Sequence, residues 1–229
     1  MTLRATIGGW LARRLAALPD RRGVKGLLRL HDWLYYFTLR VIKITEADSH
    51  PRHRVTDARE FFARHVREGD RVLDVGAAYG HNAVAVADRA SRVVGIEIRR
   101  EAVERARRER TRSNVEYRVG TIDDVPSTER FDVILLGNVL EHIADRKTFL
   151  GKCGERGRRL LIRVPAIDRD WLVPYRRELG LPWRLHPDHE IEYTTDTLER
   201  ELDAAGFVMR ECFCRFGAVH AVAEVRQEQ

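Results

Sequence analysis

The segment Val72–Gly80, with the sequence Val-Leu-Asp-Val-Gly-Ala-Ala-Tyr-Gly, most constrains what this chain can fold into. Asp74 lies within an apolar run that predicts a buried strand, and Gly76 and Gly80 bracket the turn that follows it. Glu97 comes 21 residues after Gly76, at the end of a second apolar run. In α/β sheets, an acid at the tip of the next strand accepts the ribose hydroxyls of a nucleoside. The segment therefore predicts a ligand that contains a nucleoside.

The details of the turn indicate which nucleoside compound is bound. The turn lacks the third glycine of a dinucleotide-binding motif, so a pyrophosphate is not favoured. The pattern L-D-x-G-x-x-x-G instead resembles motif I of the class I S-adenosylmethionine-dependent methyltransferases, and the resemblance continues through Phe131–Ile134 and Asn138–Ile143 to the end of the chain. It implies S-adenosylmethionine (SAM) as the cofactor. It also implies an α/β, Rossmann-like fold with a seven-stranded, mostly parallel sheet and a C-terminal antiparallel hairpin.

Strand-like and helix-like segments alternate from residue 57 onward, which is typical of a parallel sheet covered by helices. We expect a methyltransferase domain over residues 57–229, with a substrate-side insertion at 165–194, and a basic helical leader or cap over residues 1–56. The expected strands are 71–75, 92–96, 115–119, 131–136, 159–164, 207–214 and 218–225, and the expected helices are 57–66, 81–90, 100–110, 145–152 and 196–205. Asp196 and Glu199 have the spacing of an N-cap and an N3 residue in the last helix.

The leader is basic and carries apolar residues at helical spacing. Residues 1–44 hold nine Lys or Arg against two Asp, a balance of +7, whereas the whole chain has a net charge of +6. Apolar stripes before Pro19 and over Leu27–Ile44 predict two amphipathic helices joined by a turn at Arg21–Gly23. Such helices suit three roles: a cap over the active site, a homodimer contact, or peripheral contact with an anionic membrane. The rest of the chain has no basic excess, which disfavours nucleic acid as a partner.

The resemblance assigns residues at several strand ends to the cofactor. Asp74 would accept from turn amides or from the SAM ammonium group, and small residues in the turn would leave room for the methionine moiety. In the family, an acid after the third strand reads the adenine amino group; Thr121 stands there instead, so Asp123 or the Ile122 backbone is the alternative reader. The full cofactor set is Asp74, Gly76, Ala77, Tyr79, Gly80, Glu97, Ile98, Thr121, Ile122, Asp123, Asn138 and Val139.

Two histidines are the candidate catalytic residues. His142 follows the fourth strand, at the carboxyl edge of the sheet where cofactor and acceptor would meet. Because imidazole titrates near neutrality, His142 or His189 could take a proton from an acceptor hydroxyl; alternatively, His142 only packs against the turn. The predicted acceptor-binding residues are Trp171, Tyr175, Trp183 and His186, all in the insertion. No metal site is predicted, because the spacing of these histidines and acids matches no fixed ligand signature.

The reaction that these features favour is SAM-dependent O-methylation of a small molecule such as a sugar, a lipid-linked glycan or another metabolite. The alternatives are an RNA or protein methyltransferase, a cofactor-binding subunit without catalysis and, least favoured, an NAD-dependent dehydrogenase. The three cysteines have neither disulfide-framework nor zinc spacing and are expected to be core thiols. The absence of a signal peptide and of a membrane-spanning run predicts a cytoplasmic chain, soluble or membrane-peripheral.

Overall fold

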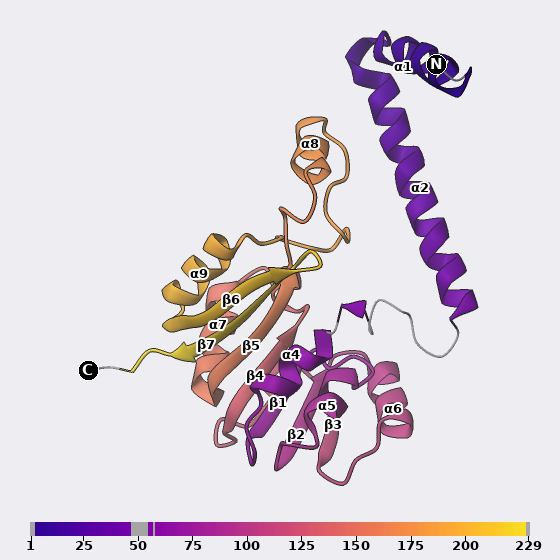
Figure 1. The fold of residues 1–229 in the computed structure, drawn as a ribbon. Helices are drawn as coiled ribbons and strands as arrows, with labels where there is room; N and C mark the ends of the chain where they lie inside the picture. The colour runs from indigo at the N-terminus through magenta and orange to yellow at the C-terminus, as the bar shows by residue number, and fades with distance from the viewer. Residues whose placement is uncertain (1–2, 47–54, 57, 228–229) are drawn as a thin grey trace. The chain divides into compact units, whose positions relative to one another are not determined.

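The computed structural model describes residues 3–46, 55–56 and 58–227 (Figure 1). These residues fall into two compact units. One comprises Met1–Val55 together with Tyr175–Pro182, and the other comprises Thr56–Pro174 together with Trp183–Gln229. Asp57, where we predicted a helix to begin, lies outside the described residues.

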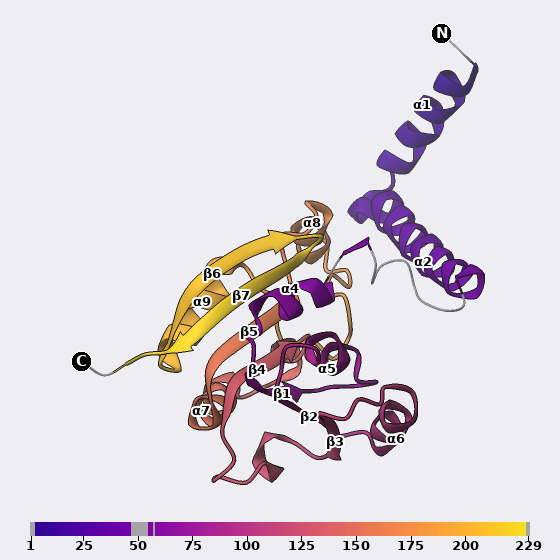
Figure 2. The ribbon, with the colours of Figure 1, turned by 60° about the horizontal axis from the view of Figure 1, so that its bottom comes forward.

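The larger unit is built on a seven-stranded sheet, which confirms the predicted α/β fold (Figures 1 and 2). The strands are β1 (Arg71–Val75), β2 (Arg92–Glu97), β3 (Val115–Val119), β4 (Phe131–Gly137), β5 (Gly157–Pro165), β6 (Phe207–Arg215) and β7 (Ala218–Val225). Their order is β3-β2-β1-β4-β5-β7-β6. β1 to β5 pair in parallel, while β7 is antiparallel to both β5 and β6. The chain changes direction across the sheet between β1 and β4, and the carboxyl edge beside such a switch point is where ligands bind.

Helices cover both faces of this sheet, because the strands are apolar on both sides. The helices of the larger unit are α4 (Ala58–His65), α5 (His81–Val86), α6 (Arg100–Glu109), α7 (Arg146–Arg156) and α9 (Thr195–Ala204); α8 (Leu172–Glu178) spans both units. In β4, Val133 packs in a cluster with α4, α5 and α6, whereas the next residue, Ile134, packs in a second cluster with α7 and α9. Two short 3₁₀ helices, η2 (Ile122–Asp124) and η3 (Leu140–His142), follow β3 and β4 at the carboxyl edge.

Several local predictions are corrected. The N-cap of α9 is Thr194, not Asp196, because the Thr194 and Thr197 side chains satisfy each other's backbone amides in a capping box. The thiols are not all in the core: Cys153 is buried, but Cys214 is exposed because it lies near the end of the edge strand β6. α5 ends at Val86, four residues before the predicted end.

The smaller unit contains α1 (Leu3–Ala16), the 3₁₀ turn η1 (Pro19–Arg21) and α2 (Arg22–Thr45). The turn between the helices is therefore earlier than predicted, and Gly23 is a buried helical residue. A Cβ on Gly23 would lie 2.1 Å from the Leu15 carbonyl oxygen, so glycine is needed where the two helices meet. Arg176 of α8 pairs with Asp32 of α2 at 2.8 Å, which ties part of the insertion to the leader. Among the described residues, no helix combines the length and apolar composition needed to cross a bilayer.

Candidate active site

The turn after β1 has the backbone expected of a ligand-binding loop. Gly76 and Gly80 adopt positive φ angles of 68° and 78°, and Ala78 between them adopts 46°. A Cβ on Gly76 would lie 2.9 Å from the Val139 side chain, and one on Gly80 would lie 2.3 Å from the Tyr117 hydroxyl. Glycine at position 80 is therefore required by packing inside the protein as well as by its backbone conformation. Ala77 is buried beside this turn.

Asp74 is a fully buried carboxylate at the centre of the sheet. It is flanked by Gly95 of β2 and Leu135 of β4. Neither carboxylate oxygen has a hydrogen-bond partner of normal geometry among the described residues. Burial raises the pKa of Asp74 to about 7, the nearby Ala83 amide opposes this shift, and the negative charge of Glu97 adds to it. An unpaired buried acid costs stability, and a positively charged or hydrogen-bonding ligand beside it would offset that cost.

Glu97 ends β2 and reaches back to the turn. Its Oε2 accepts a hydrogen bond from the Ala78 amide at 3.0 Å, and its Oε1 accepts from the Arg99 amide at 3.0 Å and from Arg99 Nε at 2.9 Å. A carboxylate offers about four lone-pair positions. Two ribose hydroxyls can therefore both be accepted only if Arg99 Nε moves away. That side chain is 56% exposed, whereas the two amides belong to the backbone.

Tyr79 and Ile98 lie at the exposed rim of this turn. Tyr79 is 38% exposed, and the guanidinium groups of Arg99 and Arg105 stand 5.7 and 4.8 Å from its ring centre. Ile98 is largely exposed. The structure thus gives Tyr79 cation–π partners within the protein, and one of them, Arg99, also pairs with Glu97.

The residues predicted to contact adenine, Thr121, Ile122 and Asp123, all make contacts within the protein. Thr121 is the N-cap of η2, and both its amide and its hydroxyl donate to Asp124 Oδ2, at 2.8 and 3.0 Å. Ile122 is buried in the core. Asp123 is paired with Lys152 at 2.6 Å. The Thr121 hydroxyl therefore donates to Asp124 and accepts from the Asp123 amide at 3.3 Å, and Asp124, which sequence reasoning overlooked, serves as its capping partner.

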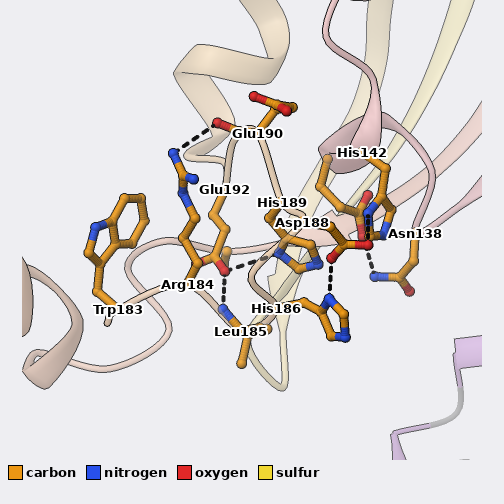
Figure 3. Close-up of polar contacts among 12 residues, drawn as sticks. Asn138, His142, Trp183, Arg184, Leu185, His186, Asp188, His189, Glu190 and Glu192 are labelled. Carbon is orange, nitrogen blue, oxygen red and sulfur yellow. Dashed lines mark hydrogen bonds and ion pairs between the residues drawn. The ribbon is translucent and has the colours of Figure 1, made fainter. Parts of the chain in front are cut away.

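Asn138 directly follows β4 and has a left-handed conformation, with φ of 62°. Its amide donates to the Arg163 carbonyl at 2.8 Å, and its side-chain oxygen accepts from the Arg163 guanidinium. Its side-chain amide donates to Glu141 Oε1 at 2.8 Å (Figure 3). Val139, the next residue, is half-buried against the core. Asn138 thus orients Glu141, a contact that the sequence did not indicate.

Glu141, His142 and His189 bring a carboxylate and two imidazoles together in one cluster. Glu141 is fully buried; its Oε2 has no hydrogen-bond partner among the described residues, and burial raises its pKa. The rings of His142 and His189 meet edge to face, with centres 4.8 Å apart. One potential ligand atom from each of the three residues lies within 4.8 Å of the others. The amide of Glu190 donates to the Glu141 carbonyl at 2.7 Å and so fixes the insertion against η3.

This donor set suits two chemistries. Neutral imidazole nitrogens beside a carboxylate can take a proton from an acceptor hydroxyl, as predicted. The same atoms can hold a divalent cation, for which the sequence spacing gave no signal because His189 is separated from Glu141 by most of the insertion.

The predicted acceptor-binding residues are only partly brought together. His186 lies near the cluster, with its ring 5.9 Å from that of His189 and its Nδ1 paired with Asp188 (Figure 3). Trp183 is half-buried, with Arg184 5.2 Å above its ring. Trp171 is 73% exposed. Tyr175 belongs to the smaller unit, together with the leader.

Three residues that sequence reasoning missed support the cluster. Arg163 holds Asn138, while Arg169 forms an ion pair with the buried Glu192, which contacts His189. Glu192 is bonded both to the Leu185 amide and to His189 (Figure 3). No local pattern marks the Arg163–Asn138 and Arg169–Glu192 contacts, because their partners are 25 and 23 residues apart in the sequence.

Comparisons with known proteins agree with this architecture. A family model described as a methyltransferase domain matches residues 47–211. A ubiquinone biosynthesis O-methyltransferase of Rhodopseudomonas palustris is 26% identical over 184 residues, which cover 70% of this chain and 73% of that protein. A SAM-dependent methyltransferase from Aquifex aeolicus has a TM-score of 0.60 at 19% identity, covering 80% of this chain and 97% of its own. A DhpI–SAH complex has a TM-score of 0.61 at 15% identity, covering 84% and 95%. The two structural likenesses concern the fold.

Proposed function

This chain belongs to the methyltransferase domain family and uses SAM as its methyl donor, and we propose that it methylates a hydroxyl group of a small molecule. The observation that carries this proposal is the buried Glu141, with one unpartnered oxygen beside His142 and His189. A hydroxyl, unlike an amine, gains nucleophilicity when its proton is removed, and this cluster offers groups that can take the proton or hold the oxygen on a cation. The cluster follows β4 at the carboxyl edge of the sheet, the same edge as the glycine turn.

The proposed reaction is an in-line displacement. SAM supplies a methyl group bound to a positively charged sulfur. The acceptor oxygen forms a bond to the methyl carbon as the carbon–sulfur bond breaks, and the hydroxyl proton passes to the Glu141, His142 and His189 cluster. Besides accepting the proton, the chain aligns the two reactants and excludes water. Alignment alone can lower the activation free energy by several kcal/mol.

Within the family assignment, we propose the cofactor contacts from the geometry. Asp74 faces the SAM amino group, Glu97 accepts from the ribose, and the backbone of Gly76 and Val139 borders the methionine moiety. The Thr121 hydroxyl donates its proton to Asp124, so toward the adenine amino group only its oxygen could act, as an acceptor. The Ile122 backbone and Asp123 remain the proposed adenine contacts.

Glu97→Gln is expected to raise the Kd for S-adenosylhomocysteine about 10–100-fold, because two hydrogen bonds to a charged acceptor weaken. Arg99→Ala is the matched control: it removes the exposed competitor for Oε1, and Kd should stay within about threefold of wild type. Calorimetry measures both. Equal affinities in wild type and Glu97→Gln would remove Glu97 from the ribose site.

The acceptor that we propose is an apolar ring compound, such as a polyprenylated phenol, in preference to a saccharide. The name of the Rhodopseudomonas relative, which places its O-methylation in ubiquinone biosynthesis, supports this choice. Incubation with labelled SAM and a panel of polyprenyl phenols, lipid-linked saccharides, RNA and protein tests it. Label in the phenol fraction is the expected result, whereas label in RNA or protein would replace the proposal with one of the alternatives.

We also propose that the leader contacts an anionic membrane at the cytoplasmic face. In α2, Trp33 and Phe37 stack with ring centres 5.4 Å apart, and both are exposed. Other large apolar side chains are exposed on the same helix: Leu27, Leu30, Leu34, Tyr35, Tyr36, Val41 and Ile44. The helix carries five Lys or Arg against one Asp. An exposed apolar face with this charge complements an anionic lipid surface.

Replacing both Trp33 and Phe37 with alanine is expected to weaken co-sedimentation with anionic vesicles at least about tenfold, since each buried aromatic contributes about 2 kcal/mol. Phe216→Ala, which removes an equally exposed aromatic from the β6–β7 turn, should leave sedimentation unchanged. If the wild-type protein does not sediment with vesicles but forms a dimer that is lost when Trp33 and Phe37 are replaced, this face is a homodimer contact instead.

A further inference from the structure

We infer that Glu192 is a positioning residue for His189: it fixes the imidazole tautomer in which Nδ1 carries the proton and Nε2 presents a lone pair to Glu141 and His142. This inference deepens the proposed function and rests on it. It concerns a residue that lies outside the reactive cluster and that does not itself touch the reacting atoms.

Glu192 is built into the protein interior. Its side chain has no exposed surface, and that of His189 is 7% exposed. Its Oε1 accepts from the Leu185 amide and lies 3.2 Å from His189 Nδ1 (Figure 3). Its Oε2 is paired with Arg169. A buried charge needs partners of this kind, and each carboxylate oxygen has one.

Arg169 makes the carboxylate rigid. Its guanidinium also donates to the Ala166 carbonyl at 2.9 Å and to the Trp183 carbonyl at 2.7 Å. Ala166 continues from the end of β5, and its amide donates to the Gly217 carbonyl in the β6–β7 turn. The ion pair therefore connects the insertion to the sheet, and Glu192 has little freedom to turn away from His189.

The chemistry of the pair determines the tautomer. A carboxylate paired with arginine can only accept, so the nitrogen that faces it must carry a hydrogen. In neutral His189, Nδ1 therefore holds the proton and Nε2 has the free lone pair. That lone pair is what either use of the cluster requires, because a proton acceptor and a cation ligand both need an unprotonated nitrogen.

His142 is held much less firmly. Its Nδ1 lies 3.3 Å from Asp188 Oδ2, but the Asp188 side chain is mostly exposed, and exposed pairs direct a side chain weakly. The two histidines therefore differ in preorganisation. The buried contact with Glu192 orients the His189 ring, whereas the exposed contact with Asp188 orients the His142 ring only weakly.

Nitrogen-15 NMR of histidine-labelled protein, recorded at a pH at which the imidazole is neutral, tests the inference without an acceptor substrate. Wild-type His189, assigned by the loss of its signals in His189→Gln, should show a protonated Nδ1 and an unprotonated Nε2. Glu192→Ala should give a mixture of tautomers and lower kcat about 10–100-fold, the range typical of lost supporting contacts. Glu192→Gln should restore both in part: its amide oxygen can accept from Leu185 and from His189, but its NH2 group replaces the oxygen that pairs with Arg169.

Glu190→Ala is the matched control, since it removes a neighbouring but exposed glutamate. It should keep the wild-type tautomer of His189 and the wild-type kcat. A wild-type His189 with its proton on Nε2 overturns the inference, even if Glu192→Ala fails to fold. So does a Glu192→Ala protein that keeps the Nδ1–H form and turns over like Glu190→Ala. Failure of the proposed function is distinguishable, because it would appear as a wild-type protein with the expected tautomer and no methyl transfer to any hydroxyl acceptor.

Discussion

Asp74→Asn is expected to make the cofactor-free protein more stable at pH 8 and, at the same time, to weaken SAM binding about 10–100-fold. The carboxyl group lies in the interior without a partner of normal geometry among the described residues, and burial raises its pKa from 3.8 to about 7. Ionising it in the folded protein therefore costs about 4 kcal/mol more than in the unfolded chain. Asparagine removes that cost. It also removes the charge that we propose to face the SAM amino group, and hydrogen bonds to charged groups contribute about 1.5–3 kcal/mol.

The sign of the pH dependence follows from the direction of this shift. A folded state with a raised carboxyl pKa binds the proton more tightly than the unfolded chain does, so the contribution of Asp74 to stability is complete at low pH. It is lost as pH rises from about 4 to about 7. The gain in melting temperature of Asp74→Asn over wild type should therefore grow between pH 5 and pH 8. SAM should reduce that gain by stabilising the wild type more than the variant.

Thermal melts with and without SAM at both pH values measure this prediction, and Asp88→Asn supplies the control. Asp88 is an exposed aspartate shortly after α5, so the same chemical change there should alter neither melting temperature nor affinity. An Asp74→Asn protein that melts below wild type at pH 8, or that binds SAM as tightly as wild type, would remove the proposed role of this residue.

The sheet was predictable from sequence because its determinants are local. Apolar runs end at Val75 and Gly137, and turn residues follow each of them, so both the strand positions and the edge that carries the ligand could be inferred. The β6–β7 hairpin was equally clear, because Gly217, with φ of 70°, supplies the turn that joins its two strands. The strands and the hairpin turn are thus determined by residues close to one another in the sequence.

The supporting contacts of the site were not predictable, because they depend on partners far away in the sequence. Arg169 and Glu192 are 23 residues apart, and nothing near either residue distinguishes a buried ion pair from two surface charges. At Thr121 the family position predicts an adenine contact, and the sequence did not indicate that its hydroxyl also donates to Asp124 in a capping box. Sequence patterns identify which strand ends carry chemistry, but the orientation of each side chain is set by its tertiary partners.

His189→Ala is expected to lower kcat about 10²–10⁴-fold at neutral pH while leaving the Kd for SAM unchanged. The reason is positional. His189 comes from the insertion and lies beside Glu141 and His142. The proposed cofactor contacts instead come from the ends of β1 to β4 and the segments that follow them: Asp74, Gly76, Glu97, Ile122, Asp123 and Val139. Single-turnover kinetics with a hydroxyl acceptor, combined with calorimetry for S-adenosylhomocysteine, measures the two quantities separately.

His65→Ala is the matched control, because it removes a half-buried histidine of α4 that pairs with Glu211 of β6, outside the cluster. Chelation then separates the two chemistries open to Glu141, His142 and His189. If the cluster takes the proton directly, EDTA leaves wild-type turnover intact. If it holds a divalent cation, EDTA abolishes turnover and the added cation restores it in wild type but not in His189→Ala. A His189→Ala enzyme with wild-type kcat would contradict a role for His189 both as a proton acceptor and as a cation ligand. The rate acceleration would then come from alignment of the reactants.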